Sequence, residues 1–343
     1  MIRPATVALT MVALVAAPFH AIGQDITVTK LPFRLRHPSA IAIRPGGSPQ
    51  NYEVYFSDFD YVSKVASDGS SAPVKVIVKL PTQPDQTSGT GLHFLDRNRL
   101  VVALHTNPSA ANVLLFEFTD DQPLSADQAT QKLGLAETGA GESAPPISVY
   151  GIARTFANDR VPDQLIATTY GSDAQPGLWK VPVRAGTLDK PAAFGAARQN
   201  ALPAAIAVSK QGYVLVAQSI ENGETNGSRL TFYNPIGGSV VMQLNMNLEN
   251  VLGLSYSPKT GNLYAANYGP TDSSFTPGAT GVYRIDDASE AGKPAARAVK
   301  IADVLRPTAM AFAPDGGLYV TAAGNTGARP IDNGFLVRIT GDL

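Results

Sequence analysis

The chain has 343 residues, a formal net charge of −1 at pH 7 and no cysteine. The absence of cysteine excludes disulfides, thiolate metal sites and cysteine nucleophiles, so stability has to come from packing. The balanced charge argues against nucleic acid as a partner, because phosphate binding requires a basic surface.

The N-terminal segment, residues 1–23, has the pattern of a secretory signal peptide. Arg3 supplies the positive charge, Val7 to Ala17 form an apolar run, and Ala21-Ile22-Gly23 gives a small-x-small cleavage site before Gln24. The run is well short of the roughly 20 residues that a membrane-spanning helix needs, and no later stretch comes closer. We therefore predict a secreted protein, periplasmic or extracellular, with no membrane span and one monomeric domain over residues 24–343.

Six segments of the remaining chain repeat one strand pattern at nearly even spacing. Each contains an apolar anchor, and the anchors are Ile41, Leu92, Ile152, Ile206, Leu254 and Met310. Their spacing of roughly 50 to 60 residues, filled with short alternating strands and turn residues, is typical of a propeller with about four strands per blade. The sequence therefore predicts an all-β fold, a six-bladed β-propeller.

The residue before each anchor is small in all six copies. These residues are Ala40, Gly91, Gly151, Ala205, Gly253 and Ala309. We interpret the pattern as steric selection, because the innermost strands of a propeller crowd together around its axis. Stacking in a solenoid is the alternative explanation.

A second strand follows each anchor strand, as in the hairpin that joins Met310–Ala313 to Leu318–Thr321 through a Pro-Asp-Gly-Gly turn. Long polar loops then lead to a third strand; they span residues 106–112, 171–176, 220–228, 268–280 and 323–333. In an antiparallel blade these loops share one end of the ring with the starts of the inner strands. Binding sites commonly lie in such loops on a rigid scaffold.

The segment from Asp120 to Ser148 departs from this rhythm, because it is rich in Ala, Gly and Pro. We expect a loosely packed outer strand around Gln131 to Ala136 and a surface loop, with a lid over one face as the alternative.

The two ends of the chain together supply one blade. The stretch from Ala311 to Leu343 has room for three strands but not four, whereas Gln24 to Ile41 precedes the first anchor without a blade of its own. The two stretches together amount to roughly 50 residues, about one period of the repeat. We therefore predict that a strand at residues 25–30 pairs with the strand around Phe335–Ile339 and closes the last blade, which removes the exposed sheet edges of an open array.

The string Ala309-Met-Ala-Phe-Ala-Pro-Asp-Gly-Gly-Leu-Tyr-Val-Thr321, repeated in looser form at Gly253–Ala266, resembles the six-bladed propellers of the NHL-repeat and SMP-30/gluconolactonase-like group. The chain looks most like the secreted bacterial members of that group. The resemblance extends over the mature chain and implies the propeller fold. Such propellers include lactonases, other hydrolases and binding proteins, so the fold does not choose among these functions.

The resemblance also implies where a metal would lie. In the lactonase branch a divalent cation is held by a Glu and an Asn near inner-strand starts and by an Asp at a second-strand end. The corresponding starts here carry neither Glu nor Asn: they are Ser39, Thr90, Tyr150, Ala204, Leu252 and Thr308. Asp58, Gln218 and Asn267, at second-strand ends, would with waters make a weak site for Ca²⁺ or another divalent cation, which wants six to eight oxygen ligands. Hydrogen bonding to loop backbone is the alternative role.

Two residues break the inner-strand pattern. The position after the anchor is small except at His93, and the next position is uncharged except at Arg154. We expect His105, at a second-strand end, to lie beside His93, with Asp58 and Tyr170 ending the second strands of the flanking blades. A buried Arg needs a partner and a His near a carboxylate can titrate near neutrality, so this cluster is our ligand-binding candidate, with packing or ion pairing as the alternative.

No Gly-x-Ser-x-Gly nucleophile elbow is present. The loops Glu221–Gly227 and Asp272–Thr276 could present acid and amide groups to a small molecule, a glycan or a protein, or could be solvated turns. We therefore expect a secreted binding or interaction module that uses its loop-rich face and central channel, with a lactone or ester hydrolase as the alternative.

Overall fold

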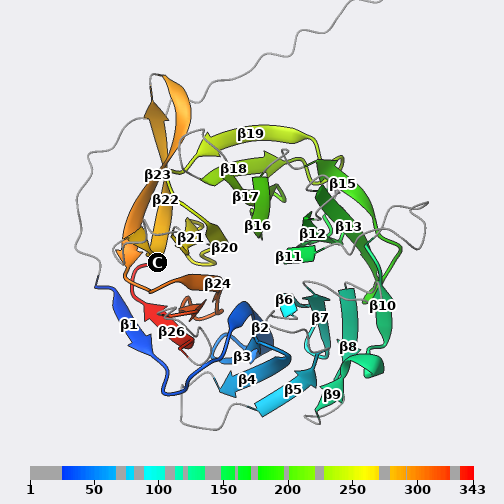
Figure 1. Ribbon diagram of the computed structural model, residues 1–343. Helices are drawn as coiled ribbons and strands as arrows, with labels where there is room; N and C mark the ends of the chain where they lie inside the picture. The colour runs from blue at the N-terminus through cyan, green and yellow to red at the C-terminus, as the bar shows by residue number, and fades with distance from the viewer. Residues whose placement is uncertain are drawn as a thin grey trace, which may run out of the picture.

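The computed structural model describes residues 25–66, 75–80, 89–104, 113–118, 123–135, 148–158, 161–170, 177–196, 201–220, 228–269, 279–290, 292–324 and 333–343. In these ranges the chain forms six small sheets arranged as blades around a central axis, which confirms the expected six-bladed β-propeller (Figure 1). The proposed signal peptide lies outside them. No helix in the described ranges has the length and apolar character to cross a membrane.

We number the blades 1 to 6 in the chain order of their innermost strands. The innermost strands are β2 (Pro38–Ser48), β6 (Gly89–Phe94), β11 (Ser148–Thr155), β16 (Ala201–Val208), β20 (Val251–Tyr256) and β24 (Pro307–Phe312). The second strands are β3 (Asn51–Asp58), β7 (Arg99–Leu104), β12 (Gln164–Tyr170), β17 (Val214–Ile220), β21 (Leu263–Asn267) and β25 (Leu318–Ala322).

The remaining strands build the outer half of each blade. The third strands are β4 (Tyr61–Ala66), β8 (Val113–Glu117), β13 (Gly177–Arg184), β18 (Ser228–Tyr233), β22 (Gly281–Glu290) and β26 (Phe335–Thr340). The outer strands are β5 (Lys75–Lys79), β10 (Gln131–Leu133), β14 (Thr187–Leu188) with β15 (Ala192–Ala196), β19 (Val240–Asn245), β23 (Lys293–Ala302) and β1 (Thr27–Lys30).

The ring is closed by the first described strand of the chain. Strand β1 pairs antiparallel with β26, with Thr27 opposite Thr340 and Lys30 opposite Val337. Blade 6 therefore has the order β1-β26-β25-β24, and its blue N-terminal and red C-terminal strands lie side by side in Figure 1. The predicted closure is confirmed.

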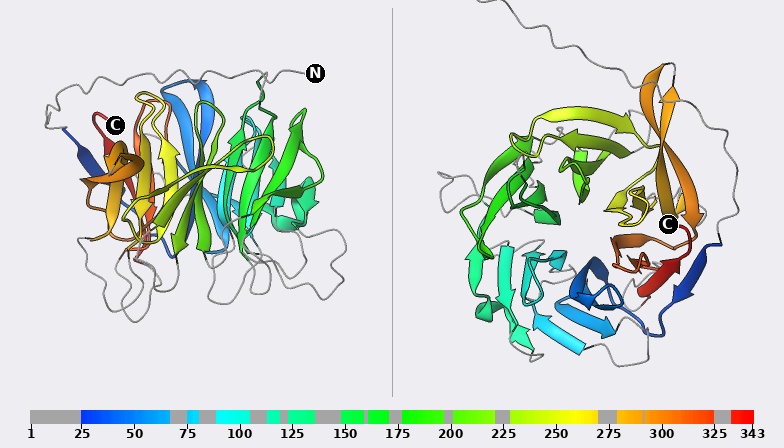
Figure 2. Two further views of the ribbon diagram at one scale, coloured as in Figure 1. Left: turned by 90° about the horizontal axis from the view of Figure 1, so that it is seen from above. Right: turned by 180° about the vertical axis from the view of Figure 1, so that it is seen from behind.

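The core is divided among the six interfaces between neighbouring blades. Seen from the side, the sheets stand upright around the axis (Figure 2). Each interface holds one cluster of buried side chains, supplied by the facing sides of two adjacent sheets. Between blades 5 and 6, for example, the rings of Tyr264 and Phe312 pack edge to face with centroids 5.2 Å apart. Stability therefore depends on blade-to-blade packing around a complete ring.

A bulge near its start interrupts the pairing of every inner strand. The register shifts immediately before the small residue in all six copies, for example between Gly89 and Gly91 in blade 2. A Cβ added at Gly91 would lie 2.7 Å from Cγ2 of Ile152, the anchor of blade 3. A Cβ at Gly253 would lie 3.1 Å from Cγ of Met310 in blade 6. The small residues are thus selected by the close approach of neighbouring inner strands.

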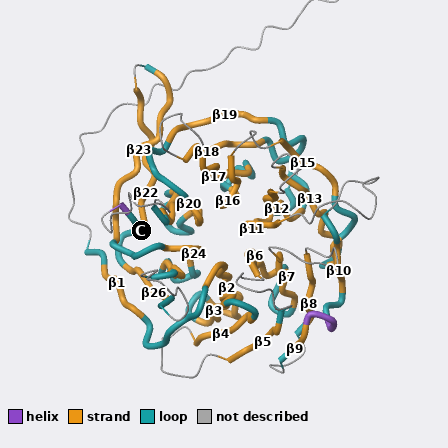
Figure 3. Tube along the Cα trace, in the orientation of Figure 1, coloured by secondary structure: helices purple, strands orange, loops and turns teal. Residues whose placement is uncertain are grey.

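The irregular segment of blade 2 joins two blades. Residues 131–133 form β10, which pairs with β8 as the outer strand that we expected. Before it, β9 (Leu124–Ser125) pairs in parallel with β5 of blade 1. A 3-10 turn, η1 (Ala126–Gln128), then connects β9 to β10 (Figure 3). Residues 136–147, which include the alternative lid, lie outside the described part of the chain.

Candidate functional site

Six residues occupy equivalent positions at the end of the ring where the inner strands begin, which we call the start end. Each lies at or near the end of a second strand, opposite the last residue before the bulge of its inner strand. They are Asp58, Leu104, Thr169, Gln218, Asn267 and Ala322. The three polar candidates Asp58, Gln218 and Asn267 therefore lie on blades 1, 4 and 5 at the same height of the ring.

The Asp58 carboxylate is engaged by backbone of the segment that crosses from blade 6 to blade 1. The Arg36 N–H donates to Oδ1 and Oδ2 at 2.9 and 3.0 Å, and the His37 N–H donates to Oδ1 at 2.6 Å. Burial raises the pKa of the Asp58 carboxyl, although these two N–H groups act in the opposite direction. The Asp58 side chain thus anchors the connection that follows β1.

The side-chain amide of Gln218 is used inside blade 4. Its Nε2 donates to the Tyr233 hydroxyl at 3.2 Å, and its Oε1 accepts from the Thr231 hydroxyl at 3.3 Å. Gln218 is only 1% exposed, so the side chain belongs to the buried face of the sheet.

Asn267 keeps one polar atom without a partner in the described part of the chain. Its Nδ2 donates to the carbonyl of Ala279 at 2.7 Å, which ties the end of β21 to the residues before β22. Its Oδ1 is buried and has no hydrogen-bond partner among the described residues. Because an orphaned buried acceptor is costly, this oxygen is the strongest sign of an additional contact at the start end.

The described donor set does not fit a divalent cation. Asp58 is the one carboxylate of the three candidates, and with the amide oxygens of Gln218 and Asn267 they supply at most four oxygens, where Ca²⁺ takes six to eight. No group of three or more His, Asp or Glu side chains able to share a metal ion occurs in the described ranges.

His93 and Arg154 lie toward the opposite end of the ring, which we call the hairpin end because the turns between inner and second strands lie there. His93 is opposite Val101 in blade 2, whereas Leu104, the residue before His105, is opposite Gly89. Three residues of β7, from Val101 to Leu104, separate the two levels, or roughly 10 Å. The expectation that the second-strand end lies beside His93 was therefore wrong, because antiparallel register places these positions at opposite ends of the hairpin.

Arg154 is held by a carboxylate that the sequence analysis did not select. Its Nε and Nη2 donate to the two oxygens of Asp163, each at 2.8 Å, and its Nη1 donates to the Leu95 carbonyl of blade 2 at 2.6 Å. The guanidinium also lies 5.0 Å from the ring centroid of Phe156, whose side chain is 64% exposed. Asp163 immediately precedes β12, across the hairpin from Arg154. A search of the sequence for a carboxylate near this unusual Arg could have identified Asp163 as its partner.

His93 faces the same interface from blade 2. Its Nε2 is buried and has no hydrogen-bond partner among the described residues, while the residue as a whole is partly exposed. Burial first, and the Arg154 cation second, lower the pKa of His93 to about 4, against a smaller opposing effect of Asp163. The imidazole is therefore neutral at physiological pH.

The two pattern breaks face each other across one blade interface. The equivalent positions at the other five interfaces are the first residue after the anchor in one blade and the second residue after the anchor in the next. There they hold a small residue and a larger, mainly apolar one: Ala42 and Phe94, Ala153 and Val208, Ala207 and Tyr256, Ser255 and Phe312, and Ala311 and Ile43. Between blades 2 and 3 a His and an ion-paired Arg replace them. The ion pair satisfies Arg154, and the neutral His93 is left to fill the space beside it.

The remaining candidates are only partly described. Tyr170 ends β12 opposite Ser148, and its side chain is not described. His105 and the loops at residues 221–227 and 272–276 lie outside the described ranges. The described candidates are thus divided between two ends of the ring, with Asp58, Gln218 and Asn267 at the start end and His93 and Arg154 toward the hairpin end.

No protein-family model matches the sequence, and a search of curated proteins finds no relative. Solved structures match over nearly the whole chain. A structure described as a gluconolactonase has a TM-score of 0.54 at 15% identity, covering 94% of this chain and 94% of that chain. A gluconolactonase from Xanthomonas campestris has a TM-score of 0.54 at 15% identity, covering 93% and 90%.

A pyrroloquinoline-quinone-bound aldose sugar dehydrogenase from Streptomyces coelicolor matches equally well, with a TM-score of 0.54 at 13% identity, covering 92% of this chain and 99% of that chain. At these identities the likeness shows the propeller fold, which proteins of different activity share. The fold-level resemblance to gluconolactonases is confirmed.

Proposed function

We propose that this propeller is a binding module rather than a metal-dependent hydrolase. The observation that carries the proposal is the use of the Asp58 and Gln218 side chains within the fold. The Asp58 carboxylate accepts hydrogen bonds from two backbone N–H groups, and the Gln218 amide is bonded at both its nitrogen and its oxygen, so each side chain already has a structural role within the fold. The proposed ligand, a small molecule, a glycan or a protein, would contact the start end of the ring and its channel.

A lactone or ester hydrolase is the second candidate. Two observations favour it: the similarity of the fold to gluconolactonases, and the buried Oδ1 of Asn267, which has no partner in the described part of the chain. A cation or a polar substrate group would satisfy that oxygen.

Hydrolysis of a panel of sugar lactones and aryl esters separates the two functions. The wild-type protein should show no turnover above the buffer rate, either with EDTA or with added Ca²⁺, Mn²⁺ or Zn²⁺. Metal-dependent turnover that is lost in both Asp58→Asn and Asn267→Ala would establish the hydrolase. Circular dichroism of the two variants distinguishes loss of activity from loss of fold.

We also propose that the chain is secreted, on the strength of Arg3, the apolar run Val7 to Ala17 and the small residues before Gln24. Mass spectrometry of protein recovered from a bacterial periplasm or culture medium should give a mature mass that begins at Gln24. An intact N-terminus on protein confined to the cytoplasm would contradict this.

A further inference from the structure

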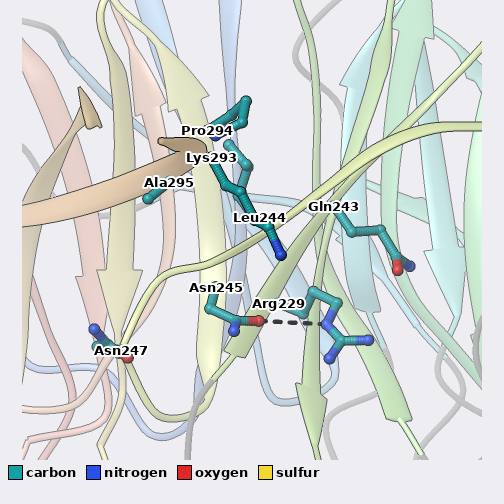
Figure 4. Close-up of a pocket in the computed structure, with 8 residues that line it drawn as sticks. All are labelled: Arg229, Gln243, Leu244, Asn245, Asn247, Lys293, Pro294 and Ala295. Atoms are coloured by element: carbon teal, nitrogen blue, oxygen red, sulfur yellow. Dashed lines mark hydrogen bonds between the residues drawn. The ribbon is translucent and has the colours of Figure 1, made fainter. Parts of the chain in front are cut away.

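The outer rim between blades 4 and 5 contains a polar pocket of about 440 Å³, where β23 begins near β19 (Figure 4). Two cationic side chains line it, Arg229 from β18 and Lys293 from β23. Gln243, Asn245 and Asn247 are the other polar residues that line it. The described lining residues include no Asp or Glu, although the chain as a whole carries a net charge of −1.

Arg229 differs from most arginines in the described part of the chain. Salt bridges engage Arg44, Arg99, Arg154, Arg184, Arg284, Arg297 and Arg338. Neither Arg229 nor Lys293 forms a salt bridge with a described residue. Arg229 donates from Nε to Asn245 Oδ1 at 3.4 Å, and its terminal nitrogens contact no acceptor among the described residues. In Figure 4 the Lys293 side chain extends toward the side of the pocket where Asn245 and Arg229 lie.

The other lining groups suit a hydroxylated ligand. Gln243 donates from Nε2 to Thr231 Oγ1 at 3.3 Å, and its Oε1 accepts no hydrogen bond from a described residue. Asn247 adds a second amide from a residue in the left-handed backbone region, with φ of 52°. Pro294 and Ala295 add a small apolar wall, and the volume lies in the range of about 300 to 1,000 Å³ typical of small-molecule sites.

We propose that this pocket binds a uronic-acid residue of an acidic oligosaccharide. An Arg guanidinium can pair with both oxygens of a carboxylate, and Lys adds a second positive charge. Amide side chains donate to and accept from sugar hydroxyls with the same group. Because the pocket lies on the outer rim, neighbouring sugars of the chain can continue along the surface. The site is separate from the start end and the hairpin end of the ring and does not rest on the proposed function.

Calorimetric titration with trigalacturonate tests the proposal, with its fully methyl-esterified form as a neutral probe of the same shape. We expect the acid to bind with a Kd below about 1 mM, the ester to bind at least about tenfold more weakly, and affinity for the acid to fall as salt rises. The variants Arg229→Gln and Lys293→Gln should each weaken binding of the acid at least about tenfold, the size of one charge-assisted hydrogen bond.

Arg184→Gln is the matched control, because it removes one positive charge from a side chain that is 79% exposed on blade 3. It should leave the affinity unchanged, and the melting temperatures of all three variants report whether they fold. No binding of trigalacturonate at millimolar concentration, equal binding of the ester, or binding that neither pocket variant weakens would overturn the site. Inorganic phosphate bound as tightly as trigalacturonate would overturn the assignment to a sugar acid.

Discussion

The Asp58 carboxylate secures the passage of the chain from β1 to β2. Replacing it in Asp58→Ala leaves the N–H groups of Arg36 and His37 without their acceptor. We expect a loss of about 1 to 3 kcal/mol in the free energy of unfolding, the usual cost of removing one partner from such bonds. Urea unfolding of the variant and the wild type measures it. Asp58→Asn retains one acceptor oxygen and should lose less; equal stability of all three proteins would show that Asp58 has no structural role.

His93 makes stability depend on pH. Burial and the Arg154 cation lower its pKa to about 4 in the folded protein, from an ordinary value of 6.5. Between these values the unfolded chain binds a proton that the folded protein does not, so stability falls as the pH drops from 6.5 to 4. We expect the wild type to lose about 1 to 2 kcal/mol more than His93→Gln between pH 7 and pH 5.

Urea unfolding of both proteins at the two pH values measures this difference, and the other titrating groups cancel in the comparison. Arg154 and Asp163 face His93 and are present in both proteins. An equal loss in the two proteins would mean that His93 titrates normally in the folded state.

The sequence singled out His93 and Arg154 because each breaks a sixfold pattern, and the structure shows them facing one another. The same reasoning could not supply Asp163, because partner choice depends on side-chain reach across a hairpin. Strand order without register also gave the wrong level for the end of β7, because Leu104 lies opposite Gly89 and not opposite His93. A pattern break therefore locates an exceptional position but leaves its contacts undetermined.

At the scale of the element, the neighbouring inner strand limits the size of the residue before each anchor. In Gly91→Ala the added Cβ would lie 2.7 Å from Ile152 Cγ2 and 3.1 Å from Ala103 Cβ. We expect a loss of about 1 to 3 kcal/mol, because a packed interface cannot take an extra methyl group without strain. Thermal or urea unfolding measures it. Gly237→Ala is the control, since its Cβ would meet nothing within 4 Å, and an equal effect of both substitutions would exclude the steric explanation.

The bulges and strand β9 are two features of the fold that the periodicity of the sequence does not predict. The inner strands were predicted from their anchors, and the small residues from their spacing, but the register shift at each start has no sequence signal beyond smallness. Strand β9 is two residues long and pairs with blade 1, so no periodicity could indicate it.

At the scale of the whole molecule, closure depends on β1. A chain that begins at Leu31 exposes the edge of β26 and removes Ile26 from the cluster between blades 5 and 6. We expect it to lose about 1 to 2 kcal/mol, because Ile26 is a partly buried aliphatic side chain, and to associate through the free edge. Thermal unfolding and light scattering report the two effects. A chain that begins at Asp25 is the control, and wild-type behaviour of the shorter chain would contradict closure by β1.

The fold was predictable because six copies of one pattern reinforce each other, and the lengths of the two terminal stretches required a shared blade. The function was less accessible, since it depends on whether individual oxygens such as those of Asp58 and Gln218 are already bonded. Those contacts come from segments far apart in the sequence, and spacing carries no information about them.

Calorimetric titration of the wild-type protein with Ca²⁺ tests most directly whether Asp58 serves the fold rather than a metal-dependent centre. Because Asp58 is the one carboxylate among the three candidates and Gln218 and Asn267 offer only amide oxygens, we predict no stoichiometric binding at micromolar concentrations. One Ca²⁺ bound per chain, with binding lost in both Asp58→Asn and Asn267→Ala while the two variants stay folded, would contradict the account.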